Sequence, residues 1–165
     1  MNKSMLVLLM TLISFQSCKD RDSIKDCCVL IDNEVLDMSV ISSTGVDLLD
    51  PSSNVYTENS IAIFELINSE ENEIFIANSD APKGFSIIEE TDLVRMRIFV
   101  GALEDSDLER ELLIEWEENT VKDTLNVFFE NGGNYKYISK VVFNSQEVFS
   151  KDENDDIPYF QIQKN

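Results

Sequence analysis

The chain of 165 residues is strongly acidic and contains no histidine. Its 32 acidic and 13 basic residues give a formal charge of −19 at pH 7, which argues against nucleic acid and anionic lipid surfaces as partners. The missing histidine excludes Ser-His-Asp and Cys-His catalysis, and the length suits one domain with a sizeable core.

The N-terminal residues predict a leader that ends at a cysteine. Lys3 precedes eleven mostly apolar residues, 5–15, which as a helix would be about 16 Å long, about half the hydrocarbon core of a membrane. We therefore predict a signal peptide over residues 1–17 rather than a membrane-spanning helix. The sequence FQSC at 15–18 resembles a bacterial lipobox, in which cleavage precedes the cysteine and Cys18 carries the lipid.

Residues 18–28 are predicted to form a lipidated tether. The sequence KDRD at 19–22 is similar to the surface-export signal of Bacteroidetes lipoproteins. This similarity implies a lipid-anchored protein of the outer membrane, exposed at the cell surface or, alternatively, on the periplasmic face. Outer-membrane lipid is then a partner through the Cys18 anchor. Cys27 and Cys28 are adjacent, which leaves open a buried or membrane-proximal role, an intermolecular disulfide, or a strained bridge between the two.

From residue 29 onward the sequence predicts short strands separated by turns. Apolar residues alternate with polar ones along five segments, and side chains two apart share one face of a strand. These segments are 35–42, 93–100, 110–117, 123–129 and 159–163. Shorter or continuous apolar runs predict further strands over 29–31, 60–67, 73–77, 85–88 and 137–149. The nearly continuous run at 60–67 predicts a central strand covered on both faces.

These predicted elements indicate an all-β domain over residues 29–165. About eight short strands, with no convincing amphipathic helix, favour an antiparallel β-sandwich that is immunoglobulin-like or related. Segments 110–117 and 123–129 read as a hairpin, in which Trp116 is the predicted core anchor.

Short motifs along the chain resemble a family. They are GVDLLDP at 45–51, EW at 115–116, DTL at 123–125 and KVVFN at 140–144. With the leader, they resemble small Bacteroidetes lipoproteins of uncharacterised function that consist of a single β-sandwich. The resemblance implies a surface-anchored lipoprotein with a non-enzymatic binding or accessory role in the cell envelope. Envelope proteins or glycans would be its partners, and no catalytic residue or cofactor is implied.

One acidic loop near the C-terminal end is the strongest candidate for a ligand site. Asp152, Asn154 and Asp156 have the one-three-five oxygen spacing of a calcium loop. The residues that follow lack the glycine and the bidentate glutamate of an EF-hand, so the hypothesis is a surface calcium site. A solvated acidic loop is the alternative, here and at the second acidic loop, 104–107.

Two further kinds of site follow from composition. Pairs of carboxylates could catalyse glycoside hydrolysis, but no particular pair stands out among 32 acidic residues. Aromatic rings could stack on sugars, for which four tyrosines are candidates: Tyr56, Tyr135, Tyr137 and Tyr159. The predicted function is a surface-anchored binding protein; a calcium-dependent binding module and a carboxylate-based glycoside hydrolase are the alternatives.

Overall fold

The computed structural model describes residues 35–90, 93–101, 108–131, 136–151 and 157–164. The predicted leader, the tether with Cys18, and the strand predicted over 29–31 lie outside these residues. The described part contains ten strands, and none of it forms a helix long and apolar enough to cross a membrane.

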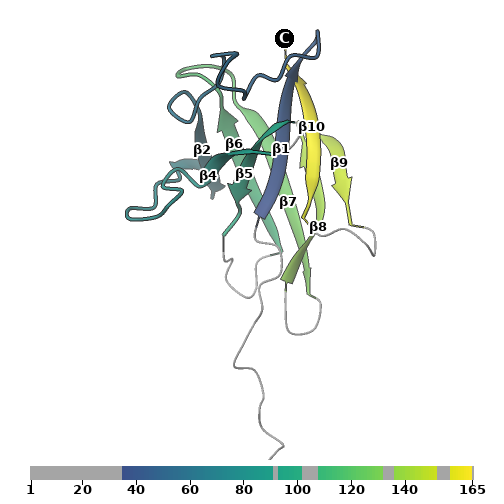
Figure 1. The fold of residues 1–165 in the computed structure, drawn as a ribbon. Helices are drawn as coiled ribbons and strands as arrows, with labels where there is room; N and C mark the ends of the chain where they lie inside the picture. Colours follow the sequence, from purple (N-terminus) through teal and green to yellow (C-terminus); the bar gives the residue numbers. More distant parts are fainter. Residues whose placement is uncertain (1–34, 91–92, 102–107, 132–135, 152–156, 165) are drawn as a thin grey trace, which may run out of the picture.

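The strands form two sheets that pack face to face (Figure 1). The four-stranded sheet contains β1 (Val35–Ser42), β4 (Phe85–Glu89), β5 (Val94–Phe99) and β10 (Tyr159–Lys164), in the order β10-β1-β5-β4. The six-stranded sheet contains β2 (Ala62–Ile67), β3 (Glu70–Glu73), β6 (Glu109–Glu115), β7 (Asp123–Asn131), β8 (Lys136–Phe143) and β9 (Gln146–Ser150). Its order is β3-β2-β6-β7-β8-β9.

The strand order follows the immunoglobulin-like pattern. β1, β5 and β4 correspond to strands B, E and D, while β3, β2, β6 and β7 correspond to C′, C, F and G. The position of strand A beside strand B is taken by β10, which pairs with β1 in parallel. The predicted all-β sandwich is therefore confirmed. The described residues contain ten strands where about eight were expected, and one pair, β1 with β10, is parallel in an otherwise antiparallel sandwich.

The core lies between the sheets and follows the predicted alternation. Leu36, Met38 and Val40 of β1 are all fully buried, as are Leu112 and Ile114 of β6. Trp116 is 2% exposed, which confirms it as a core residue. Each fully buried aliphatic side chain of this size contributes about 1.5–3 kcal/mol, so the matched inner faces hold the sheets together.

The strand predicted at 73–77 is wrong. The strand is β3, four residues of which three are glutamates, and it pairs with β2 across the turn Asn68-Ser69. Both turn residues have positive φ (53° and 68°), as a tight hairpin turn requires. Ile74 follows the last residue of β3 and packs against the core. It is apolar because it is partly buried there, and not because it belongs to a strand.

The strand predicted at 60–67 is present as β2, but only one of its faces is buried. Ile63 is 1% exposed and faces the core, whereas Phe64 and Leu66 are half-buried on the outer face. The continuous apolar run therefore reflects a partly apolar outer surface of the six-stranded sheet.

The start of β1 lies at the lower end of the sandwich in Figure 1. The strand registers place the ends of β5, β7 and β9 and the starts of β6, β8 and β10 at this same lower end. The C-terminal end of β10 lies at the upper end. A chain that enters the domain at Val35 therefore enters at the lower end.

Candidate functional site

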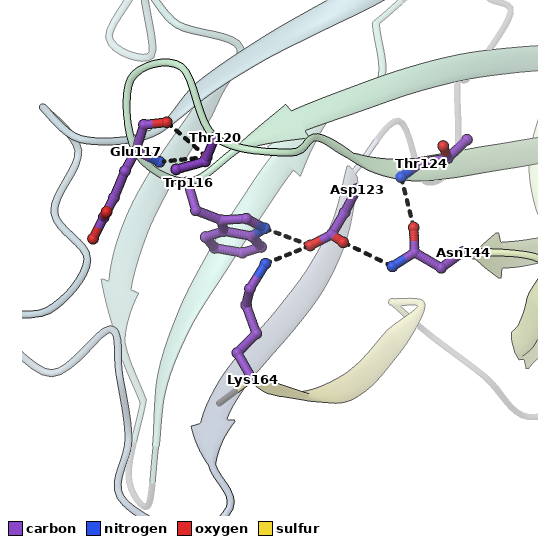
Figure 2. A network of polar contacts seen from close by, with 7 residues as sticks. All are labelled: Trp116, Glu117, Thr120, Asp123, Thr124, Asn144 and Lys164. Carbon is purple, nitrogen blue, oxygen red and sulfur yellow. Dashed lines mark hydrogen bonds and ion pairs between the residues drawn. The ribbon is translucent and has the colours of Figure 1, made fainter.

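A polar cluster, the clasp, consists of Trp116, Asp123, Asn144 and Lys164 (Figure 2). The Asp123 carboxylate accepts hydrogen bonds from Trp116 Nε1 (2.6 Å), Lys164 Nζ (2.6 Å) and Asn144 Nδ2 (2.8 Å). Asn144 Oδ1 in turn accepts a hydrogen bond from the backbone N–H of Thr124 (2.8 Å). Because Lys164 ends β10 in one sheet and Asp123 begins β7 in the other, the clasp joins the two sheets.

The side chains of the clasp hydrogen-bond to one another or contact one another. Burial raises the pKa of Asp123, but the hydrogen bonds from Lys164, Asn144 and Trp116 outweigh burial and hold that pKa below its usual value. The Trp116 ring contacts Lys164 Nζ (4.6 Å from the centroid) and the Tyr56 ring (centroids 5.0 Å apart). We therefore interpret the clasp as structural, and Tyr56 as a packing residue of it rather than a sugar platform.

A second cluster, the sealed face, lies on the outer side of the four-stranded sheet. Asp37 is only 1% exposed although it faces away from the core, and it accepts two hydrogen bonds from Arg97 (Nε–Oδ1 2.8 Å, Nη2–Oδ2 2.9 Å). Arg95 Nη1 lies 3.9 Å from Asp37 Oδ2, and its guanidinium stacks on the Tyr159 ring at 4.4 Å. The Tyr159 hydroxyl is 2.9 Å from Ser39 Oγ. Among the described residues, Arg95 Nε is the buried side-chain atom of this face that has no hydrogen-bond partner.

A groove of about 490 Å³ opens on the outer side of the six-stranded sheet, towards its lower end. It lies beside a bulge in β8, because Phe128 pairs with Lys140 and Phe129 pairs with Ile138, which leaves Ser139 as the extra residue between them. β7 keeps its alternation here, so Phe128 lies on the outer surface while Phe129, 6% exposed, faces the core with Val127. Lys140 on β8 places its ammonium 4.1 Å from the centre of the Phe128 ring.

The walls of the groove combine apolar and polar side chains. Leu108, which is 46% exposed, and Phe128 supply the apolar surface. The polar groups come from four neighbouring strands, β6 to β9: Glu109, Glu130, Ser139, Lys140 and Ser150. The volume falls within the range of about 300–1,000 Å³ that is usual for small-ligand sites. Among the described residues, this groove is our candidate functional site.

One predicted residue lies beside the groove. The Tyr137 hydroxyl donates to a Glu130 carboxylate oxygen (3.1 Å), and the Tyr137 ring contacts the Lys151 ammonium at 4.5 Å. Glu109 and Glu130 bring two carboxylates to the groove, and no sequence pattern distinguishes them from the other acidic residues. The glycoside hydrolase alternative stays a prediction.

The structure does not bring the sequence candidates together. Tyr56 belongs to the clasp, Tyr159 to the sealed face, and Tyr137 to the rim of the groove. The other candidates lie outside the described residues: Cys18, Tyr135, residues 104–107, and the calcium ligands Asp152, Asn154 and Asp156. Within the described ranges, no three acidic or cysteine side chains are placed to hold a metal ion.

The groove has a faint signal in the sequence. In β8 the apolar residues Ile138 and Val141 are three positions apart, which breaks the two-residue alternation of a strand and is typical of a bulge. Its other walls come from strands whose pairing the sequence alone does not specify.

Comparison with known proteins yields no relative. No family model, no curated protein and no solved structure matches the chain. The immunoglobulin-like description therefore rests on strand order, and the groove is interpreted from its own side chains.

Proposed function

We propose that this chain is a surface-anchored lipoprotein of the cell envelope, whose β-sandwich has a non-enzymatic binding or accessory role. The observation that carries the proposal is the sequence FQSC at 15–18, which follows an apolar segment too short to span a membrane. Lipidation at Cys18 would anchor the domain by its N-terminal end, and the KDRD sequence that follows favours the outer membrane and its outer surface.

The length of chain after Cys18 suits a tether. Residues 19–34 separate Cys18 from Val35, the first residue of β1, and sixteen residues extend to roughly 58 Å at most. This tether would reach the domain at its lower end, where the groove also lies. The high negative charge supports an exposed, soluble domain that does not itself bind an anionic surface.

Metabolic labelling in a bacterium with lipoprotein processing tests the anchor. With an alkyne-tagged palmitate, the wild-type chain and a Cys27→Ser control should become labelled, whereas Cys18→Ser should not. Globomycin should make the larger precursor accumulate. Labelling that persists in Cys18→Ser, or its absence from the wild type, would contradict the proposal. Surface biotinylation of intact cells then separates the outer surface from the periplasmic face.

A further inference from the structure

We propose that the groove at the β8 bulge binds a neutral oligosaccharide. This inference rests on the binding role proposed above and names the ligand class of that role. The groove is the described region where exposed apolar surface, hydroxyls, carboxylates and an ammonium converge on one space.

The polar walls of the groove both donate and accept hydrogen bonds. Glu109 and Glu130 accept, Lys140 donates, and the Ser150 hydroxyl can do either; Ser139 Oγ donates to the Phe128 carbonyl (3.4 Å) and can still accept. A sugar hydroxyl also donates and accepts at one atom, so a polyhydroxylated ligand can satisfy all of these groups. A purely apolar ligand would instead leave the carboxylates and the ammonium desolvated without partners, which is costly.

The apolar wall supplies the second half of carbohydrate recognition. The Leu108 side chain, 46% exposed, and the Phe128 ring stand beside the polar groups. The C–H faces of a sugar ring pack on apolar surface of this kind while its hydroxyls reach outward. The Lys140 ammonium covers the Phe128 ring in the ligand-free groove at 4.1 Å, so we expect a bound sugar to share or displace that contact.

Charge selects a neutral sugar over an acidic one. Two carboxylates and one ammonium leave the groove with an excess negative charge, and the whole chain carries −19. Uronic acids, sulfated glycans and phosphates would be repelled at long range and at the site. A cationic ligand would gain no favourable contact from the Lys140 ammonium or from the apolar wall. Neutral hexose and pentose polymers meet neither objection.

The same sheet offers a matched control for the groove. Phe64 on β2 is also half-buried on the outer face, and the Lys122 ammonium lies 3.6 Å from the centre of its ring. This pair has the chemistry of Phe128 with Lys140, but it does not line the groove. Phe128→Ala and Phe64→Ala therefore remove the same ring from similar surroundings and differ in the loss of the groove wall.

Calorimetry on the full-length lipidated chain in an amine-oxide detergent tests the inference. The probes are maltohexaose and the neutral hexasaccharides obtained from cellulose, laminarin, xylan and mannan. Polygalacturonate is the anionic comparison. We expect at least one neutral probe to bind in the micromolar to millimolar range. Leu108→Ala and Phe128→Ala should weaken its binding by at least about tenfold, and Phe64→Ala by less than about twofold.

Three results would overturn the inference: no neutral hexasaccharide binds, polygalacturonate binds more tightly than all of them, or Phe128→Ala and Phe64→Ala weaken binding equally. Thermal unfolding of each variant checks that the sheet is intact. The experiment is independent of lipidation. An acylated chain that binds no sugar would end this inference alone, and a sugar-binding chain without the acyl group would end only the proposed anchor.

Discussion

The polar side chains on the two outer faces of the sandwich differ in their burial and in their partners. On the four-stranded sheet, the Asp37 carboxylate is 1% exposed and accepts two hydrogen bonds from Arg97, while Arg95 covers the Tyr159 ring. On the six-stranded sheet, polar side chains line an open groove beside exposed apolar surface. On the first face, the polar side chains mainly contact one another, whereas on the second face they are accessible to solvent.

We interpret the sealed face as a source of folding stability and the groove as the part of the surface that is available to a ligand. A buried charge that loses its partner is costly, so the residues of the sealed face cannot change singly without a loss of folding free energy. Side chains that line an open groove stabilise the fold little, and they are free to serve a ligand. The following predictions test whether the two faces differ in this way.

The largest expected effect is at the sealed face. Asp37→Ala leaves Arg97 and Arg95 without their shared carboxylate beneath the surface of the sheet. Loss of one partner of a buried ion pair costs about 3–5 kcal/mol, and because the arginines are about 30% exposed we expect the low end of that range, about 3 kcal/mol. Urea unfolding monitored by circular dichroism measures the change.

The control for this variant comes from the groove. Glu109→Ala removes an exposed carboxylate, and we expect it to change the free energy of unfolding by less than about 0.5 kcal/mol. If the two substitutions destabilise the protein equally, Asp37 is not a buried structural charge and the comparison of the two faces fails.

The sealed face also shows where sequence patterns stop being informative. Alternation in 35–42 correctly predicted that Leu36, Met38 and Val40 face the core. The same pattern predicts that Asp37 lies on the outer face of the sheet, which is correct, and that its side chain is exposed to solvent, which is wrong. Its burial depends on a residue sixty positions away, Arg97, that strand register places directly opposite. Periodicity fixes which side a residue faces and does not fix its neighbour across the sheet.

The groove was less predictable than the core for a related reason. Its walls come from four strands, and a bulge at Ser139 of β8 shifts the pairing of that strand with β7. β3 was missed because a strand of three glutamates and one asparagine has no apolar period, so only the Asn68-Ser69 turn could have signalled it. β10 was located correctly, but its parallel pairing depends on which strand lies beside it in the folded sheet.

A smaller effect is expected at the clasp, where pH adds a second measurement. Asp123→Asn removes the charge that holds Lys164 and weakens the hydrogen bonds from Trp116 and Asn144. Hydrogen bonds to charged groups contribute about 1.5–3 kcal/mol each, and because Asp123 is partly exposed we expect a total loss of about 2 kcal/mol at pH 7.

The pH dependence of that loss has a definite sign. The folded pKa of Asp123 is below its usual value of 3.8, so the charged carboxylate stabilises the fold above about pH 4. This contribution disappears as the pH falls through the folded pKa. The difference in unfolding free energy between the wild type and Asp123→Asn should therefore shrink between pH 5 and pH 2. A difference that is constant over this interval would show that the charge of Asp123 does not stabilise the clasp.

The smallest effect compares one tyrosine from each face. Ser39 is fully buried, and Tyr159→Phe removes the hydroxyl that lies 2.9 Å from Ser39 Oγ, so a buried polar group is left without that partner at a cost of about 1 kcal/mol. Tyr137→Phe removes a hydroxyl bonded to Glu130 in an exposed position, for which we expect less than about 0.5 kcal/mol. Chemical unfolding of both variants under identical conditions resolves the difference.

The double variant Ser39→Ala with Tyr159→Phe decides whether burial is the cause. Replacing both partners leaves no buried hydroxyl unsatisfied, so the double variant should be more stable than Tyr159→Phe alone. If the two losses simply add, the hydrogen bond contributes nothing beyond its separate groups. In that case Tyr159 is held by its contact with Arg95, and its ring, rather than its hydroxyl, seals the outer side of the four-stranded sheet.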